Sequence, residues 1–430
     1  GVAIVIQDTR NYKEVTDLLG GEFYVDWDKF AQQDFPGDNT ALQNDLRRPN
    51  RIVRVGDQVG YDYYSRIRQQ SGWLAYSLET NKWEVSVAGA AKAHSFFREG
   101  LTQNGKFPDN SFGESDKHLF FLPSGKGLLR YKLDGRNYLS VSGIVSENAP
   151  TFRNSFISPR TRNTVVNGLE TEKLQSGEAR YDYKSPYLKF SLAGYYTTTK
   201  DGIESTSFYH DDLRTFANFT LTNIDRRYSG VEGAVQYTLV PGLTGSAAAS
   251  VGQYIYTSRP IATLTRDNSG TLLQENRTIY AKNFFVAETT QRAYTVGLTY
   301  KNKSFWTFYL NVNRFEKNYI DFNPIRRTEA AIEFLEVGSE QWNEIIFQEE
   351  VDPAWTVDLS INKSWKPKMW DGSTLLLNVG ITNLLNNTDY INGGFEQYRF
   401  DLASKDINTF PTKYSYMEGL NYFLQLGLRF

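Results

Sequence analysis

Residues able to do chemistry are scarce and scattered in this sequence. Its 430 residues include no cysteine and three histidines, which excludes disulfides, thiolate metal sites and a cysteine nucleophile. His94, His118 and His210 are too far apart in sequence to predict a metal site. Asp211 and Asp212 follow His210 and could help it hold a cation, but such a run is more typical of a solvated acidic loop. Because no phosphate-binding glycine loop, nucleophile elbow or calcium-loop spacing occurs either, we expect no enzyme activity, no cofactor and no metal.

Two polar segments are better suited to binding a ligand, because each combines arginine with aromatic rings. The candidate ligand-binding residues are Asp321, Phe322, Arg326, Arg327, Phe395, Tyr398 and Arg399. Guanidinium groups and ring faces can hold anionic ligands, peptides or sugar rings. The alternative is that these segments only pack on one another and form salt bridges that keep them closed. Which small molecule, glycan or peptide would bind stays open.

The composition points to the elements that must position these residues. Lysine and arginine total 47 against 49 acidic residues, a net charge of −2, which gives no electrostatic footprint for nucleic acid. Aromatic residues make up 15% of the chain, and an aromatic-rich, cysteine-free, polar sequence is typical of a transmembrane β-barrel, in which only alternate residues face lipid. The longest uncharged stretch, 233–258, contains the turn signal Pro241-Gly242 and predicts a hairpin rather than a membrane helix.

One segment near the C-terminus shows the strand pattern most clearly. Its apolar face is formed by Trp355, Val357, Leu359, Ile361 and Trp365. Ten residues separate the two tryptophans, which corresponds to about 33 Å of strand, or roughly 25 Å of membrane height at a tilt of about 40°. A strand of a soluble β-sandwich is usually shorter and has no reason to carry tryptophan at both ends. We predict a lipid-facing aromatic girdle that includes Trp306, Trp355, Trp365 and Phe430.

Short turns and long polar connections alternate along the chain. Short turns are predicted at 81–82, 134–135, 185–186, 241–242, 302–303 and 371–372, and long connections over 99–118, 149–171, 201–225, 259–290, 320–352 and 388–416. In an antiparallel barrel this alternation places all short turns at one end and all long loops at the other. We therefore predict an all-β, antiparallel transmembrane barrel with periplasmic turns and extracellular loops.

The strand count is about fourteen. Thirteen strands are predicted back to about residue 71, a long loop covers 11–70, and Val2 to Gln7 would form a fourteenth strand. The last strand alternates Tyr422, Leu424, Leu426, Leu428 and Phe430, and a chain that stops on an aromatic after such a row resembles the assembly signal of outer-membrane barrels.

The segment 375–390 (LLLNVGITNLLNNTDY) makes the resemblance specific. It resembles the penultimate-strand motif of TonB-dependent receptors. Several loop segments resemble the corresponding sequences of receptors of the Bacteroidota branch. These segments are 107–113 (FPDNSFG), 158–162 (SPRTR), 207–212 (SFYHDD), 321–328 (DFNPIRRT), 393–400 (GGFEQYRF) and 410–414 (FPTKY).

That family resemblance implies a 22-stranded barrel, an N-terminal plug and active uptake of a scarce or large nutrient driven by TonB. Residues 1–430 would then be the C-terminal part of the barrel, without the plug and the first strands. The implied partners are outer-membrane lipid, the remainder of the receptor, TonB and an unknown ligand, with a surface lipoprotein as a further candidate. Two alternatives are a complete fourteen-stranded passive channel and a soluble β-rich binding protein.

Overall fold

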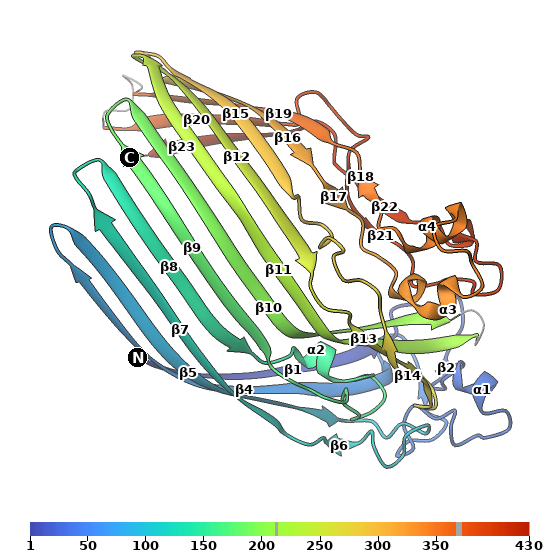
Figure 1. The fold of residues 1–430 in the computed structure, drawn as a ribbon. Helices are drawn as coiled ribbons and strands as arrows, with labels where there is room; N and C mark the ends of the chain where they lie inside the picture. Colours follow the sequence, from blue (N-terminus) through green and yellow to red (C-terminus); the bar gives the residue numbers. More distant parts are fainter. Residues whose placement is uncertain (211–213, 367–371, 430) are drawn as a thin grey trace.

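The computed structural model describes residues 1–210, 214–366 and 372–429. Its centre is one antiparallel sheet of 17 strands, of which three, β6 (Gly113–Glu114), β13 and β14, are short additions at the loop end. The remaining fourteen follow one another in an up-and-down order (Figure 1). They are β1 (Val2–Glu14), β4 (Gln58–Glu79), β5 (Trp83–Gly100), β7 (His118–Lys132), β8 (Asn137–Asn148), β9 (Glu172–Lys184), β10 (Leu188–His210), β11 (Thr215–Val240), β12 (Leu243–Tyr256), β15 (Arg292–Lys301), β16 (Trp306–Glu316), β19 (Ala354–Trp365), β20 (Thr374–Thr382) and β23 (Asn421–Arg429).

The two faces of this sheet differ in polarity, as the period-2 pattern predicted. On one face Leu359 of β19 lies opposite Leu310 of β16 and Ile381 of β20. On the other face the Asn313 amide donates to Asp358 Oδ2 at 2.8 Å and to Thr356 Oγ1 at 3.1 Å. Because all fourteen strands belong to one curled sheet, a two-sheet soluble sandwich is excluded.

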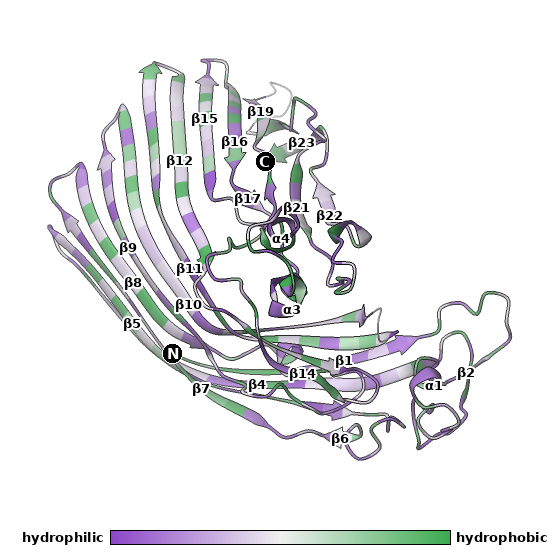
Figure 2. Cartoon of the chain, turned by 45° about the vertical axis from the view of Figure 1, so that its right-hand side comes forward, coloured by the Kyte–Doolittle hydropathy of each residue, from purple (hydrophilic) through white to green (hydrophobic). Residues whose placement is uncertain are grey.

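The apolar face is open rather than packed against other chain. Val296 is 62% exposed and Leu424 is 64% exposed, and green bands alternate with purple along the strands (Figure 2). An apolar surface of this extent in water would be an association site, and it suits contact with lipid.

The predicted girdle tryptophans lie at both ends of this apolar face. Trp355 is at the loop end of β19, and the guanidinium of Arg314 lies 4.7 Å from its ring centroid. Trp306 and Trp365 are at the turn end of their strands, with Lys363 Nζ 5.3 Å from the Trp306 ring. Phe430 lies outside the described residues. Lipid contact by these rings stays a prediction.

Strand boundaries correct two of the predicted loops. The loop over 11–70 is shorter, since β1 continues to Glu14 and β4 begins at Gln58. The loop over 201–225 is wrong, because β10 and β11 remain paired beyond it, up to His210 opposite Thr215. Shifts of register near Gly202 bend this hairpin (Figure 1), as β-bulges do. The polar composition of this segment concealed the strands.

The other connections carry short elements of their own. These are β2 (Tyr24–Val25), β3 (Ile52–Val53), β13 (Ile261–Arg266), β14 (Leu272–Thr278), β17 (Asn318–Tyr319), β18 (Glu350–Val351), β21 (Ile391–Phe395) and β22 (Lys413–Tyr416), with helices α1 (Ala31–Asp34), α2 (Phe152–Ser155), η1 (Pro324–Arg327), α3 (Glu329–Ile332), α4 (Glu340–Ile346) and η2 (Ile407–Thr409). Among the described residues, no helix is both long and apolar enough to cross a membrane. The short turns join strands at the predicted positions, and the one at 371–372 falls partly outside the described residues.

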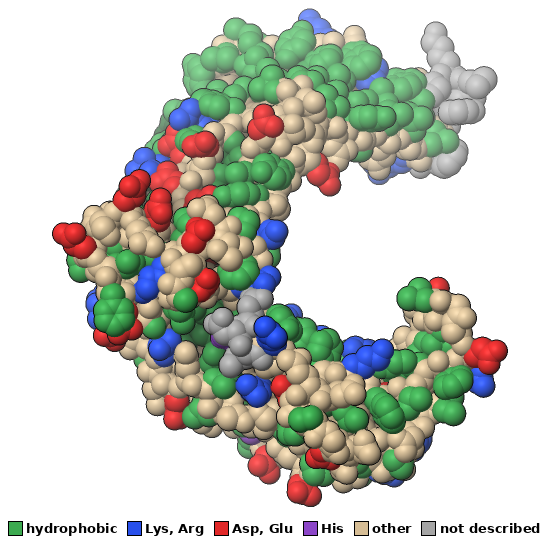
Figure 3. Space-filling model, turned by 90° about the vertical axis from the view of Figure 1, so that its right-hand side faces the viewer, with side chains coloured by type: hydrophobic (Ala, Val, Ile, Leu, Met, Phe, Trp, Pro, Cys, Tyr) green, Lys and Arg blue, Asp and Glu red, His purple; other side chains and the backbone are tan. Residues whose placement is uncertain are grey.

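The first and last strands keep one edge each without a sheet partner. In the described part of the chain, β1 pairs with β4 and β23 pairs with β20, and no register joins β1 to β23. Figure 3 accordingly shows an incomplete ring that is open on one side.

Candidate ligand-binding site

At the loop end, the β10–β11 hairpin extends the main sheet and carries two short additional strands, β13 and β14. β13 pairs with β11 from Ala217 opposite Arg266 to Thr222 opposite Ile261, and β14 pairs with β13. This four-stranded extension carries apolar side chains on one face even though its sequence is largely polar. It therefore provides a floor on which the loops can pack.

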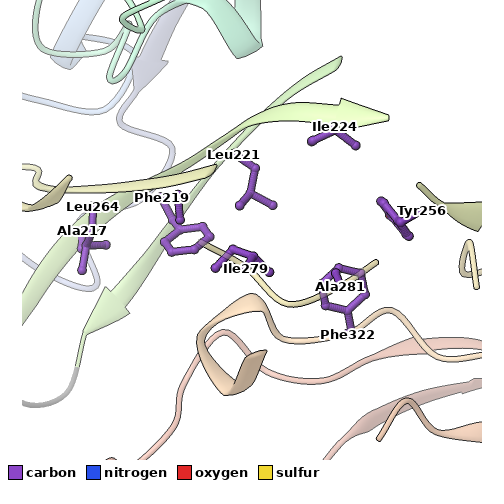
Figure 4. Packing of buried hydrophobic residues seen from close by; sticks show 10 residues of the cluster. Ala217, Phe219, Leu221, Ile224, Tyr256, Leu264, Ile279, Ala281 and Phe322 are labelled. Atoms are coloured by element: carbon purple, nitrogen blue, oxygen red, sulfur yellow. The ribbon is translucent and has the colours of Figure 1, made fainter. Parts of the chain in front are cut away.

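A buried apolar cluster covers that extension and joins it to two distant loops (Figure 4). Its members are Ala217, Phe219, Leu221, Ile224, Tyr256, Ala262, Leu264, Ile279, Ala281 and Phe322. Phe322 is 4% exposed and meets the Tyr256 ring edge-on at 5.4 Å. The predicted ligand-binding residue Phe322 is therefore part of the loop core, since its ring has no access to a ligand.

The structure brings the two predicted segments together. The backbone N–H of Asp321 donates to Gly394 O at 3.0 Å, and Glu396 N–H donates to Asp321 O at 2.8 Å. Asp321 and Phe395 form an isolated parallel bridge. Residues more than 70 positions apart thus share one short stretch of backbone pairing.

Glu396, which the sequence analysis did not single out, holds this junction by charge. Its carboxylate pairs with Arg327 and lies 3.1 Å from Arg326 NH1. It also accepts the backbone N–H of Asn323 at 2.8 Å. The Arg327 side chain is fully buried and that of Glu396 is 4% exposed. Arg326 and Arg327 are therefore occupied by a buried ion network, which supports the alternative of closed, salt-bridged loops for these two residues.

Burial shifts the ionisation of the neighbouring groups. It raises the pKa of Asp321 to about 6, and repulsion from Glu204, Glu288 and Glu396 adds to the shift. Burial lowers the pKa of Arg326 to about 10, although Glu396 opposes this change. The junction is therefore sensitive to charge, with an acid that ionises only near neutral pH.

A cavity of about 190 Å³ lies between the four-stranded extension and the second segment. Phe208, Phe219, Tyr398, Phe400 and Phe410 give it aromatic walls. Its polar lining includes Arg277, Arg399, Gln274, His210 and one acidic residue, Asp401. Arg399 stacks on Phe410 at 4.1 Å, and Phe208 stacks on His210 at 6.0 Å. Of the seven predicted ligand-binding residues, Tyr398 and Arg399 line this cavity.

Arg277 distinguishes the cavity from an ordinary gap in a core. It comes from β14, is partly buried, and has no ion pair or side-chain hydrogen bond in the described part of the chain. A guanidinium group among aromatic faces can bind an anionic or ring-bearing group by charge-assisted hydrogen bonds and stacking. The cavity volume suits a single ring or a small anionic group rather than an entire large ligand.

Two of the three histidines lie beside the same aromatic ring. His94 and His118 both face the Phe96 ring, at 6.0 Å and 5.6 Å between centroids. Across the described residues, no group of three or more His, Cys, Asp or Glu side chains could hold a metal ion.

The sequence matches the family model described as TonB dependent receptor-like, beta-barrel, over residues 4–384. The chain belongs to the TonB-dependent receptor family. No curated protein matches it, and its resemblance to the Bacteroidota branch stays a prediction. Members of this family are outer-membrane transport receptors.

Three solved structures of receptors and transporters share the fold. The siderophore receptor PiuA from Acinetobacter baumannii matches with a TM-score of 0.55 at 14% identity, over 87% of this chain and 44% of that one. The copper transporter OprC matches with a TM-score of 0.54 at 12% identity, over 88% of this chain and 50% of that one. The ferric-catecholate import receptor Fiu from E. coli K12 matches with a TM-score of 0.50 at 12% identity, over 87% of this chain and 46% of that one. Such identities show the fold alone, and the chain spans about half the length of these structures.

A second set of loops in this TonB-dependent receptor barrel is fixed in a comparable way. The guanidinium of Arg98, 1% exposed, donates to Pro159 O at 2.6 Å, Ser111 O at 2.7 Å and Asn163 Oδ1 at 2.6 Å. It thereby connects the loop segment 107–113 to the loop segment 158–162. Buried polar contacts therefore join these loops, which the sequence analysis did not anticipate.

Proposed function

We propose that residues 1–430 form the C-terminal part of an outer-membrane receptor that takes up a scarce or large nutrient with energy from TonB. Family membership and the antiparallel ring support this proposal. The free edges of β1 and β23 are the observation that carries it. In hydrocarbon each unpaired backbone group costs several kcal/mol, so both edges need partners. We infer that the missing strands of a 22-stranded barrel, and a plug on which TonB acts, belong to the same receptor.

The loop end would face the medium and the short turns the periplasm. The cavity beside Tyr398 and Arg277 would then receive one anionic or ring-bearing part of a small molecule, glycan or peptide. The buried Arg327–Glu396 junction would hold the cavity walls in place rather than contact the ligand. A surface lipoprotein remains a candidate partner that could cover the loops.

The competing proposal is a complete fourteen-stranded passive channel, in which β1 would pair directly with β23. Because this chain contains no cysteine, introduced cysteines report cleanly on strand proximity. Ile4→Cys combined in turn with Tyr422→Cys, Leu424→Cys or Leu426→Cys should give no oxidative cross-link in the full-length protein in its membrane. Leu310→Cys with Leu359→Cys, which lie opposite one another, is the positive control. A cross-link between β1 and β23 as efficient as the control would refute the receptor proposal.

Transport itself separates the two proposals without knowledge of the ligand. Liposomes containing the full-length receptor should not swell in arabinose, because a plugged barrel admits no small sugar. A passive channel of this size would let arabinose enter at once. In cells, deletion of the gene should impair growth on one particular nutrient. Uptake of that nutrient should also disappear when TonB is absent.

A further inference from the structure

A second cleft, also of about 190 Å³, lies at the loop end of β1 and β4. It forms where the segment 15–57, with α1 and β2, extends beyond the ends of these two strands (Figure 1). Its charged lining consists of Arg10, Arg47, Arg48, Arg51, Asp45 and Asp62. Four arginines against two carboxylates leave it with excess positive charge.

The carboxylates of this cleft already have partners. Asp62 accepts Arg10 Nε at 3.0 Å and Arg10 NH2 at 2.7 Å. Asp45 Oδ1 accepts the backbone N–H groups of Arg47 and Gln103, both at 3.1 Å. Cations are therefore poorly suited to this cleft, because its acidic oxygens are committed to N–H donors.

Two of the arginines are free to bind. Arg47 and Arg48 are exposed, and within the described ranges neither guanidinium forms an ion pair or a hydrogen bond. Arg47 stacks on the Phe112 ring at 4.3 Å, which limits its freedom before any ligand arrives. Arg51 is held by Asp26 at 2.8 Å and completes the positive wall.

The height of the cleft along β1 indicates that lipid headgroups surround it. Along β1 the exposed apolar side chains Val2, Ile4 and Ile6 are followed on the same face by Arg10. Four residues of strand, about 13 Å, separate Ile6 from Arg10, with Asp8 between them on the same face, so the cleft lies above the apolar band. That level of a barrel lies among lipid headgroups.

Neighbouring arginines at this level are neutralised within the sheet. Arg66 NH1 lies 2.9 Å and Arg68 NH1 lies 2.6 Å from the Asp8 carboxylate. Charged side chains at the membrane boundary are thus usually paired here, and Arg47 with Arg48 depart from that arrangement. The guanidinium groups of Arg47 and Arg48 are therefore available to an anion from outside the described chain.

We propose that this cleft binds a phosphate group of an anionic lipid headgroup in the outer leaflet. The planar guanidinium fork matches phosphate oxygens and donates two parallel hydrogen bonds to them. Phosphate could also come from solution, but the height of the cleft at the edge of the apolar band favours a lipid. The site is separate from the cavity beside Tyr398, so it does not depend on nutrient uptake.

The test is lipid retention by the full-length receptor in detergent, measured by native mass spectrometry. The probes are lipid A, which carries two phosphate groups, dephosphorylated lipid A, and inorganic phosphate. The variant Arg47→Gln/Arg48→Gln removes the two unpaired guanidiniums. The control Arg259→Gln/Lys282→Gln removes equal charge from another loop, in which exposed Arg259 stacks on Tyr280 at 5.3 Å. Heat-modified gel mobility confirms that each barrel is folded.

Wild type and control should retain lipid A about tenfold better than Arg47→Gln/Arg48→Gln, and the difference should shrink at high salt because exposed charges are screened. Inorganic phosphate should bind far more weakly than lipid A. Equal retention of lipid A and its dephosphorylated form, or an equal loss in the control variant, would overturn the proposal. Binding of inorganic phosphate as tight as that of lipid A would overturn the lipid assignment.

Discussion

Replacing Glu396 by glutamine should loosen the junction between the two loops without unfolding the barrel. The substitution keeps the size of the side chain and an oxygen for the Asn323 N–H, but it removes the charge that Arg327 and Arg326 share. Removing one partner of a buried ion pair costs about 3–5 kcal/mol, because the remaining charge stays buried. This rule applies to Arg327, since its side chain has no access to solvent and its Nε has no hydrogen-bond partner.

The effect should be local and measurable by hydrogen exchange. At about 1.4 kcal/mol for each tenfold change, amides of the segments 320–332 and 394–400 should exchange roughly a hundredfold to several thousandfold faster. Amides of β16 and β19 should be unchanged, because the sheet below makes no use of Glu396. The assay uses the full-length receptor in detergent at constant pH.

An exposed ion pair of the same connection provides the matched control. Lys317 and Glu350 lie 2.8 Å apart with side chains 42% and 38% exposed, so Glu350→Gln should cost at most about 1 kcal/mol. If Glu396→Gln accelerates exchange no more than Glu350→Gln does, the buried network does not hold the loops and the reasoning is wrong.

Three further results are expected. Asp321→Asn should stabilise the loops above pH 6 and not at pH 4. The folded-state pKa of Asp321 is raised from 3.8 to about 6, so the stability of the wild type falls as pH rises from about 4 to about 6 and then stays lower. The loss is on the order of 3 kcal/mol, at about 1.4 kcal/mol for each pKa unit. Urea unfolding monitored against pH checks this, with exposed Asp352→Asn as the control that leaves the profile unchanged. Leu359→Arg should lower the free energy of barrel unfolding by about 2–4 kcal/mol, because the side chain lies near the membrane midplane. Ser360→Arg on the polar face should lower it much less. Equal losses would contradict the strand register. Arg277→Gln should weaken binding of benzoate to the cavity but not of benzyl alcohol, as measured by NMR titration, whereas an equal effect on both would exclude an anionic subsite.

The membrane half of the fold could be predicted because its determinants are local. Alternation along Trp355 to Trp365 predicted β19 to within one residue of its observed start at Ala354. The dipeptide Pro241-Gly242 predicted the turn between β11 and β12. Lipid on one side and a polar interior on the other impose a period of two on every strand, so the pattern can be recognised without knowledge of the neighbours.

The loop half could not be predicted in the same way, because its determinants are distant in sequence. Polar residues outnumber apolar ones in 201–225. The segment nevertheless continues two strands, since β13 and the loop carrying Phe322 supply partners for its apolar side chains. The pair Arg327 and Glu396 is separated by 69 positions. Charge complementarity between these two segments was the one signal that could have suggested the pairing.

The candidate site shows why residue type alone could not identify the ligand-binding residues. Arginine beside an aromatic ring suits both ligand binding and a buried salt bridge, and only burial separates the two roles. Arg327 is in the core, Arg399 is at the cavity, and Phe395 is 48% exposed away from it. Arg277, Phe208 and Phe219 were missed because they lie on strands that the sequence did not reveal.

Buried ion pairs at the loop end have a consequence for ligand binding. The Glu396 network and the apolar cluster around Phe322 tie the loops beside the Tyr398 cavity to one another by buried contacts within the chain, which orders the walls of that cavity. A ligand that enters an ordered cavity does not have to supply the free energy that fixes loops, and this raises the affinity obtainable from few contacts. A receptor for a scarce nutrient needs such affinity at low concentration. Loosening the junction by Glu396→Gln should therefore weaken ligand binding at the cavity, even though Glu396 does not line it.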